Sequence, residues 1–296
     1  MDETPTRGHS VHWGVRWTAV VAAAVFCGLG PLLVMAKRGW WFFLPGEVGS
    51  GDYIGYPYVV VMFLLPFYAI PTWRYSRSNA LGWVSLLFPV LYCAGFYWPA
   101  FVWDLPGGPW IWPIGTFLGN LALAVGAWLA MADDEGRLRT LPRRLVAWLG
   151  IATAAFYGIA AAIVYDRRLW TDSPPSAYNV APNGQFEREW LWPMSDWVVG
   201  IVLPVAVSVL VFFGARAERG APAVVRWLVF ALVVLATIAG AIGIVAPDAA
   251  PLLGQISAVL DGPLNNALLP GLVAVALWLA ARRERRLTPA PSRTSG

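Results

Sequence analysis

The sequence predicts an all-α integral membrane protein with about eight transmembrane helices. Hydrophobic residues make up 58% of the 296 residues and charged residues only 13%, whereas about a quarter of the residues in soluble proteins are charged. The apolar residues fall into runs of about 20, the length at which a helix crosses a bilayer. Basic residues are distributed unevenly between the connections, which also predicts an orientation.

The predicted helices form one membrane domain that covers residues 1–296. The first run, 17–35, is compatible with a signal peptide, but it exceeds the usual core of about 7–15 residues and no small-residue cleavage site follows, so we assign it as a helix. A basic, disordered cytoplasmic tail is expected at 282–296. The remaining predicted helices are 56–73, 80–102, 110–131, 145–165, 197–215, 224–245 and 264–281.

Basic residues predict which side of the membrane each connection faces. If the helices alternate, 16 of the 21 Lys and Arg residues share one side. Since Lys and Arg are enriched in short cytoplasmic loops, both termini are predicted to be cytoplasmic. Arginine outnumbers lysine by twenty to one, a bias that favours a bacterial cytoplasmic membrane.

The helices 197–215 and 264–281 carry similar sequences. Leu203–Arg219 and Leu269–Arg285 both begin with Leu-Pro and end with arginine-rich segments. This similarity is compatible with four related parallel hairpins. It is equally compatible with unrelated helices that share a proline near one end and arginines at the other.

Small and polar residues predict how the helices pack. Ala154, Gly158 and Ala162 are spaced by four residues, as are Ala236 and Gly240, so the helices 145–165 and 224–245 are expected at the centre of the bundle. Asn120 is expected to form an interhelical hydrogen bond. Kinks are expected at Pro66, Pro89, Pro204 and Pro270.

The segment 166–197 separates two apolar runs and contains four prolines and four tryptophans. This composition cannot span a bilayer, because the backbone groups released by the prolines and the charged side chains need water or protein partners. It is also too aromatic for a flexible linker. We therefore expect an ordered extracytoplasmic cap.

Tryptophan is concentrated on the predicted outer side, where ten of the 18 tryptophans lie, together with ten of the 17 acidic residues. One interpretation is an aromatic belt at the lipid headgroups. The other is a ligand site, since aromatic faces beside carboxylates bind cations. Asp196 and Asp261 also precede predicted helices, where a carboxylate can cap a helix N-terminus. The candidate binding residues are Trp103, Asp104, Asp166, Trp170, Trp192, Asp196 and Asp261.

These features favour a permease or accessory subunit that binds or passes a small amphiphilic or cationic compound at its outer face. No charged residue lies centrally in any apolar run, which disfavours ion-coupled transport. One alternative is a membrane-embedded enzyme that acts on a lipid-like or isoprenoid substrate through the outer carboxylates. Another is a sensor or assembly partner.

The sequence assigns no catalytic residue, cofactor or metal. Its only histidines, His9 and His12, precede the first helix, and no metal-binding or nucleotide-binding motif occurs. The arginines lie beside apolar runs and form no stripe of their own, so nucleic acid is not expected as a partner. The expected partners are the lipid bilayer and a small amphiphilic ligand or a lipid.

Overall fold

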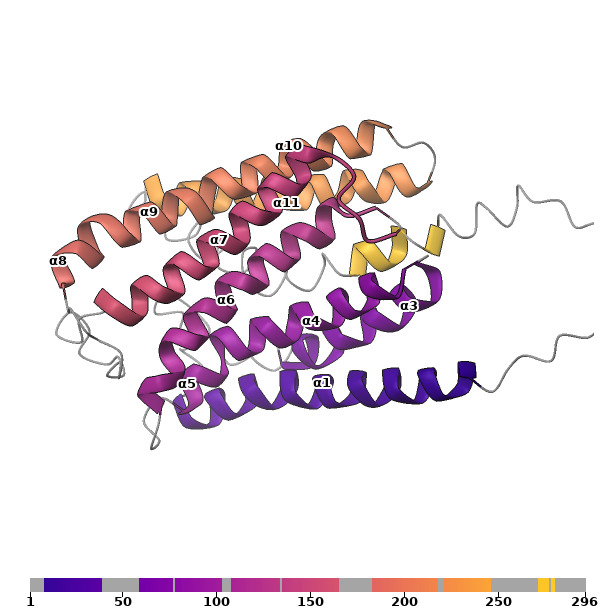
Figure 1. The fold of residues 1–296 in the computed structure, drawn as a ribbon, viewed down its shortest axis with the longest axis horizontal. Helices are drawn as coiled ribbons and strands as arrows, with labels where there is room; N and C mark the ends of the chain where they lie inside the picture. The colour runs from indigo at the N-terminus through magenta and orange to yellow at the C-terminus, as the bar shows by residue number, and fades with distance from the viewer. Residues whose placement is uncertain are drawn as a thin grey trace, which may run out of the picture.

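The chain folds into a bundle of helices. Within the residues that the computed structural model describes there are helices and no strands. Neighbouring helices lie side by side along the long axis, and successive ones run in opposite directions (Figure 1). The predicted all-α fold class is confirmed. The described residues are 8–38, 59–76, 78–102, 108–133, 135–164, 183–217, 221–245, 271–276 and 278–279.

Four of these helices are long and apolar enough to cross a membrane, so the structure supports a membrane protein. They are Trp13–Val34, Pro113–Met131, Leu141–Val164 and Val198–Ala217. The shorter apolar helices are Val59–Tyr75, Asn79–Gly95 and Ala223–Leu235. Eight crossings and the grouping into hairpins stay predictions. The predicted tail 282–296 lies outside the described residues, as does much of the second repeat.

The first half of the bundle contains two proline-dependent departures from regular helix. α1 is Gly8–Arg38. The following helix includes the 3-10 turn η2, Leu65–Tyr68, before α3, Ala69–Tyr75. Pro66 lies in η2, where the expected kink takes the form of a tighter turn.

The predicted helix 80–102 is two helices, which corrects that prediction. α4, Asn79–Phe96, ends before a turn at Tyr97, and α5, Trp98–Val102, follows. Pro99 explains the break, because it has no N–H for the carbonyl four residues earlier. Pro89, by contrast, lies inside α4.

The helix that follows the predicted cap begins much earlier than expected. It runs without interruption from Gly184 to Ala217, whereas the sequence predicted a start at residue 197. Two segments within it are π-helical, and each ends two residues before a proline, Pro193 or Pro204. A π turn removes the requirement for the proline N–H and relieves the clash with the preceding turn. The elements are α8 (Gly184–Phe186), η4 (Glu187–Leu191), α9 (Trp192–Trp197), η5 (Val198–Val202) and α10 (Leu203–Ala217).

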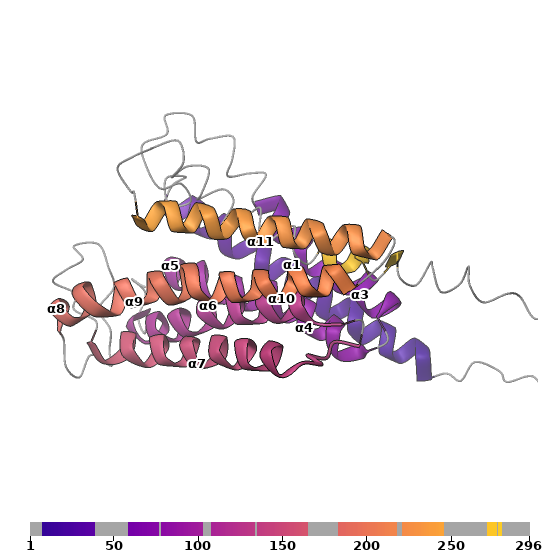
Figure 2. The ribbon, with the colours of Figure 1, turned by 90° about the horizontal axis from the view of Figure 1, so that it is seen from above.

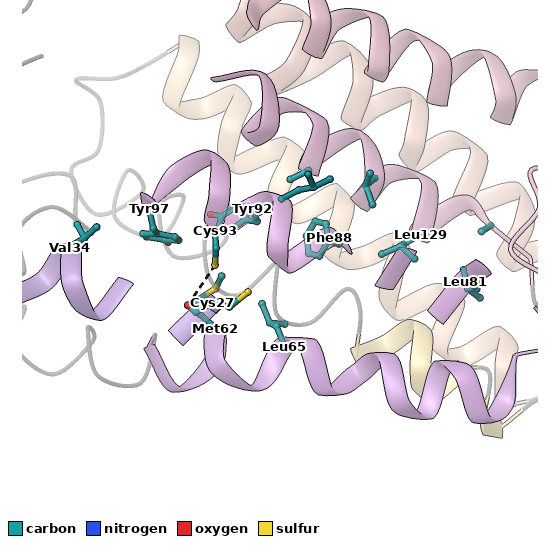
Figure 3. Close-up of a cluster of buried hydrophobic side chains, with 14 residues drawn as sticks. Cys27, Val34, Met62, Leu65, Leu81, Phe88, Tyr92, Cys93, Tyr97 and Leu129 are labelled. Atoms are coloured by element: carbon teal, nitrogen blue, oxygen red, sulfur yellow. Dashed lines mark hydrogen bonds between the residues drawn. The ribbon is translucent and has the colours of Figure 1, made fainter. Parts of the chain in front are cut away.

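α6, Gly108–Met131, joins the two halves of the core. Ala122, Val125 and Leu129 pack into a cluster with residues of α1 and α4, including the buried Cys27 and Cys93 (Figure 3). The last turn of α6 contributes to a second cluster with α7 (Leu141–Val164), α10 and α11 (Ala221–Val245). α6 is therefore central among the described helices.

α7 and α11 do not occupy the predicted central position. The two helices lie at opposite edges of the bundle in Figure 2. On α7, Trp148 is 66% exposed and Ile159 is 61% exposed. In α7 the predicted close approach through a small residue is nevertheless present, whereas at Ala236 and Gly240 of α11 it stays a prediction. A Cβ on Gly158 would lie 2.7 Å from Phe117 Cβ of α6. Small residues at four-residue spacing therefore indicate a close contact between two helices, but they do not indicate that a helix is central in the bundle.

Asn120 also differs from expectation. Its Nδ2 donates to the carbonyl oxygen of Thr116, 2.8 Å away and one turn earlier in α6. Within the described part of the chain this bond replaces the predicted interhelical one.

A compact loop holds one end of the bundle together. The Asp133 carboxylate accepts hydrogen bonds from the N–H groups of Glu135 (2.9 Å) and Arg137 (2.8 Å) and from the Arg139 guanidinium. Gly136 adopts φ +73°, the left-handed region that glycine tolerates, and packs on Leu81 of α4.

Arg226 of α11 connects to the same end. It donates to the carbonyl oxygens of Ala130 (3.2 Å) and Ala132 (2.9 Å), which lie at the end of α6 where no helical N–H follows. The charge also complements the negative end of the helix dipole.

Candidate ligand site at the outer end of the helices

The two ends of the bundle differ in chemistry. One end carries Arg16, Arg74, Arg143, Arg216 and Arg226, and we call it the inner end; the other carries α5, α8 and α9, and we call it the outer end (Figure 1). One contact at the inner end, that of Arg226 with the end of α6, joins segments that are far apart in sequence. The predicted division of basic residues between the two sides of a membrane stays a prediction.

Most of the predicted site residues lie outside the described part of the chain, so their grouping stays a prediction. These are Trp103, Asp104, Asp166, Trp170 and Asp261. Trp192 and Asp196 are located by their backbone alone. Both lie in α9, between the two π-helical segments.

Asn183 provides the N-cap of the continuous helix Gly184–Ala217, which we call the outer helix. Its Oδ1 accepts from the N–H of Phe186 (3.1 Å), three residues on. Asp196 lies well inside the helix that begins at Gly184. The expectation that Asp196 caps a helix N-terminus is therefore wrong, because the helix extends past it in the N-terminal direction.

The two ends of the predicted cap meet at the outer end. The Asn183 N–H donates to the carbonyl oxygen of Val164, the last residue of α7, at 3.1 Å. Residues 184–197 of the predicted cap are helical, which corrects the boundary between cap and transmembrane helix. The rest of the cap, 166–182, lies outside the described residues.

The outer helix presents an exposed aromatic and acidic surface. Its apolar side chains, Phe186, Trp190, Met194 and Trp197, follow one another at four, four and three residues, so they lie close to one face of the helix, and Glu189 comes one turn after Phe186 at the edge of that face. Glu189 is exposed beside them, and its carboxylate accepts from Gln185 Nε2 at 3.3 Å. We call this set the outer stripe: Phe186 (40% exposed), Glu189, Trp190 (68%), Met194 (41%) and Trp197 (52%).

The tryptophan of α5 has a structural role instead. The Trp98 ring stacks on Phe26 of α1 with centroids 5.1 Å apart, and Nε1 donates to the Phe26 carbonyl at 3.4 Å. A Cβ on Gly30 would lie 3.0 Å from Trp98 Nε1, so glycine lets the indole approach α1. This tryptophan therefore joins α5 to α1.

Nearby, Lys37 already occupies an aromatic face. Its Nζ lies 5.1 Å from the Phe101 ring centroid and donates to the Phe101 carbonyl oxygen at 2.7 Å. The outer rim therefore contains both packed aromatic residues and, in the outer stripe, exposed ones.

None of the outer-stripe residues was among the binding residues predicted from the sequence. The tryptophan count marked the segment, but Glu189 and Trp190 were not selected, because no pattern separated them from the rest of the predicted cap. Trp192 and Pro193 suggested a loop there. The available signal was Asn183, because asparagine is a favoured N-cap and indicates a helix that begins at Gly184.

The outer stripe combines two kinds of group that suit a cation. An exposed indole attracts a cation through its ring face, and the neighbouring carboxylate adds charge. In the described residues no group of three or more His, Cys, Asp or Glu side chains is placed to hold a metal ion.

Comparisons with protein-family models, with curated proteins and with solved structures give no match to this chain.

Proposed function

We propose that this chain is a polytopic protein of a bacterial cytoplasmic membrane that binds, or passes, a small amphiphilic or cationic compound at its outer face. Eight crossings with both termini in the cytoplasm complete the proposal. The observation that carries it is the outer stripe, in which Trp190 and its sequence neighbour Glu189 are both exposed.

The length of the outer helix supports a position beyond the lipid tails. The apolar span Val198–Ala217 has 20 residues and matches a hydrocarbon core of about 30 Å. Gly184–Trp197 then projects roughly 20 Å further, at about 1.5 Å per residue. Tryptophan and glutamate at that level contact headgroups and water, where a cationic compound first meets the protein.

Binding of a lipophilic cation tests this proposal. The full chain in phosphatidylcholine nanodiscs is titrated with tetraphenylphosphonium, and the dissociation constant is measured by equilibrium dialysis. Trp190→Ala should weaken binding about two- to fivefold, because an exposed cation–π contact contributes about 0.5–1 kcal/mol. Glu189→Gln should also weaken binding, most strongly at low salt.

Trp148→Ala is the matched control. Trp148 is 66% exposed and Trp190 is 68% exposed, but Trp148 lies on α7 and is not part of the outer stripe. Its removal should leave the dissociation constant unchanged. An equal loss of affinity in the two tryptophan variants would show that the compound partitions into lipid without a specific site, and it would contradict the proposal.

A further inference from the structure

Arg16 lies in an aromatic frame at the inner end of the bundle. Its guanidinium carbon is 4.9 Å from the Trp13 ring centroid and 5.4 Å from that of Trp73. Its Nη2 donates to Asn79 Oδ1 at 2.7 Å. Residues from α1, α3 and α4 thus surround one cation.

The frame around Arg16 is itself well fixed. Trp73 is 5% exposed, and its Nε1 donates to the Asn79 carbonyl oxygen at 3.2 Å. Its indole occupies the space that a side chain at Gly82 would need. Trp73 also packs edge-to-face on Trp83, with centroids 4.9 Å apart. The packed Trp73 ring and the hydrogen bond to Asn79 therefore restrict the orientation of the Arg16 guanidinium.

The charge of Arg16 is not neutralised within the described residues. A guanidinium has five N–H donors, and one of them has an acceptor, the Asn79 side chain. The ion pairs between described residues join Arg137 and Arg139 to Asp133 and Glu135, and none of them includes Arg16. Arg16 is half-buried, so part of the guanidinium stays accessible.

The position of Arg16 favours a phosphate as ligand. It lies one turn inside the start of the span Trp13–Val34, at the level where tryptophan and arginine meet lipid headgroups. Exposed Arg74, next to Trp73, adds positive charge. A fixed, planar guanidinium fork matches two oxygens of a phosphate.

We propose that Arg16, framed by Trp13 and Trp73, is a binding site for a phosphate group, supplied by the headgroup of an anionic lipid. This site lies at the opposite end of the bundle from the outer stripe and does not depend on the proposed function. It gives the protein a specific contact with the lipid leaflet at its inner end.

Native mass spectrometry of the full chain in detergent micelles tests the site. Phosphatidylglycerol or phosphatidylcholine is added, and the apparent affinity of each is read from the bound fraction. The wild-type chain should prefer phosphatidylglycerol. Arg16→Gln should weaken phosphatidylglycerol binding about tenfold, the loss expected for a charge-assisted hydrogen bond. Arg216→Gln is the control, since Arg216 is exposed on the last turn of α10 and has no cation–π contact among the described residues, and it should change the affinity less than about twofold.

The source of the phosphate is decided by adding inorganic phosphate in place of lipid. Displacement of phosphatidylglycerol by millimolar inorganic phosphate would support the phosphate site and assign it to a soluble ligand. No displacement, with binding lost in Arg16→Gln, supports the lipid. Unchanged phosphatidylglycerol binding in Arg16→Gln would overturn the proposal and leave Arg16 as a link between α1 and α4.

Arg16→Lys covers the case in which the Gln variant does not fold. Lysine keeps the charge but loses the planar fork and the stacking on indole. Weaker phosphatidylglycerol binding in a folded Lys variant supports a site specific for guanidinium. Full binding in that variant would overturn it in favour of general attraction between charges.

Discussion

At Gly95 the backbones of α4 and α6 approach so closely that a Cβ would overlap the backbone N and Cα of Gly119. Backbone atoms cannot move aside as a flexible side chain can, so Gly95→Ala should lower the free energy of unfolding by about 1–3 kcal/mol. Gly14→Ala is the control, because a Cβ there meets nothing within 4 Å. Alanine should raise stability at that helical position by about 0.5–1 kcal/mol. Thermal unfolding in nanodiscs measures both, and equal effects would contradict the close approach.

Asp133 should make the inner loop sensitive to acid. Its partial burial raises the pKa, but hydrogen bonds from Arg137, Arg139 and Glu135 outweigh this and lower the pKa below its usual 3.8. Because the folded pKa is below the unfolded one, the stabilisation is complete at neutral pH and is lost as the pH falls through the folded pKa.

Asp133→Asn tests this dependence. It should cost about 1–2 kcal/mol at pH 7, since it removes the charged pair with Arg139 while an amide oxygen can still accept the backbone bonds. The difference from wild type should shrink below about pH 4. Glu135→Gln, which removes longer ion pairs of 3.7 Å, should cost less than about 0.5 kcal/mol. A gap between Asp133→Asn and wild type that stays constant down to pH 3 would contradict the assignment.

Among the elements, the outer helix shows what the sequence could and could not predict. Its apolar part, 197–215, was predicted because apolar runs of that length have few other uses. Its polar part was not, because proline and charge normally end a helix. The π-helical segments before Pro193 and Pro204 remove this conflict, and no simple sequence pattern specifies such a segment.

The N-cap of the outer helix gives a direct test of where it begins. Asn183→Ala should cost about 1 kcal/mol, since it removes the acceptor for the Phe186 N–H. Asp196→Ala should cost little, because Asp196 is inside the helix. Asp196→Asn should leave stability unchanged, and weaker binding of tetraphenylphosphonium in that variant would add Asp196 to the outer site. A loss of stability in Asp196→Ala alone would place the helix start near residue 197, as the sequence suggested.

In the whole molecule, the sequence predicted the fold class but not which helix is central. Membrane helices are apolar on faces that contact lipid as well as on buried faces, so hydrophobicity does not separate the two. The exposed Trp148 and Ile159 of α7 illustrate this. Only close contacts leave a signal, such as Gly158 against Phe117. The same holds for the candidate site: tryptophan is typical both of a belt at the lipid headgroups and of a binding surface, so its presence does not distinguish the two.

Orientation in the membrane is the property on which the proposed function depends most. The inner end carries basic residues of α1, α3, α7, α10 and α11, and the enrichment of basic residues in short cytoplasmic loops predicts a cytoplasmic location for this end. Thr140, exposed in the inner connection before α7, should then lie in the cytoplasm, and Ser176, in the predicted cap, outside. Buried Cys27 and Cys93 are first replaced by alanine, and single cysteines are introduced by Ser176→Cys and Thr140→Cys. A membrane-impermeant maleimide added to intact cells should label the first variant and should label the second only after the cells are opened. Labelling of both in intact cells would place the two connections on one side, which an odd number of crossings between them forbids, and the alternating topology would be wrong.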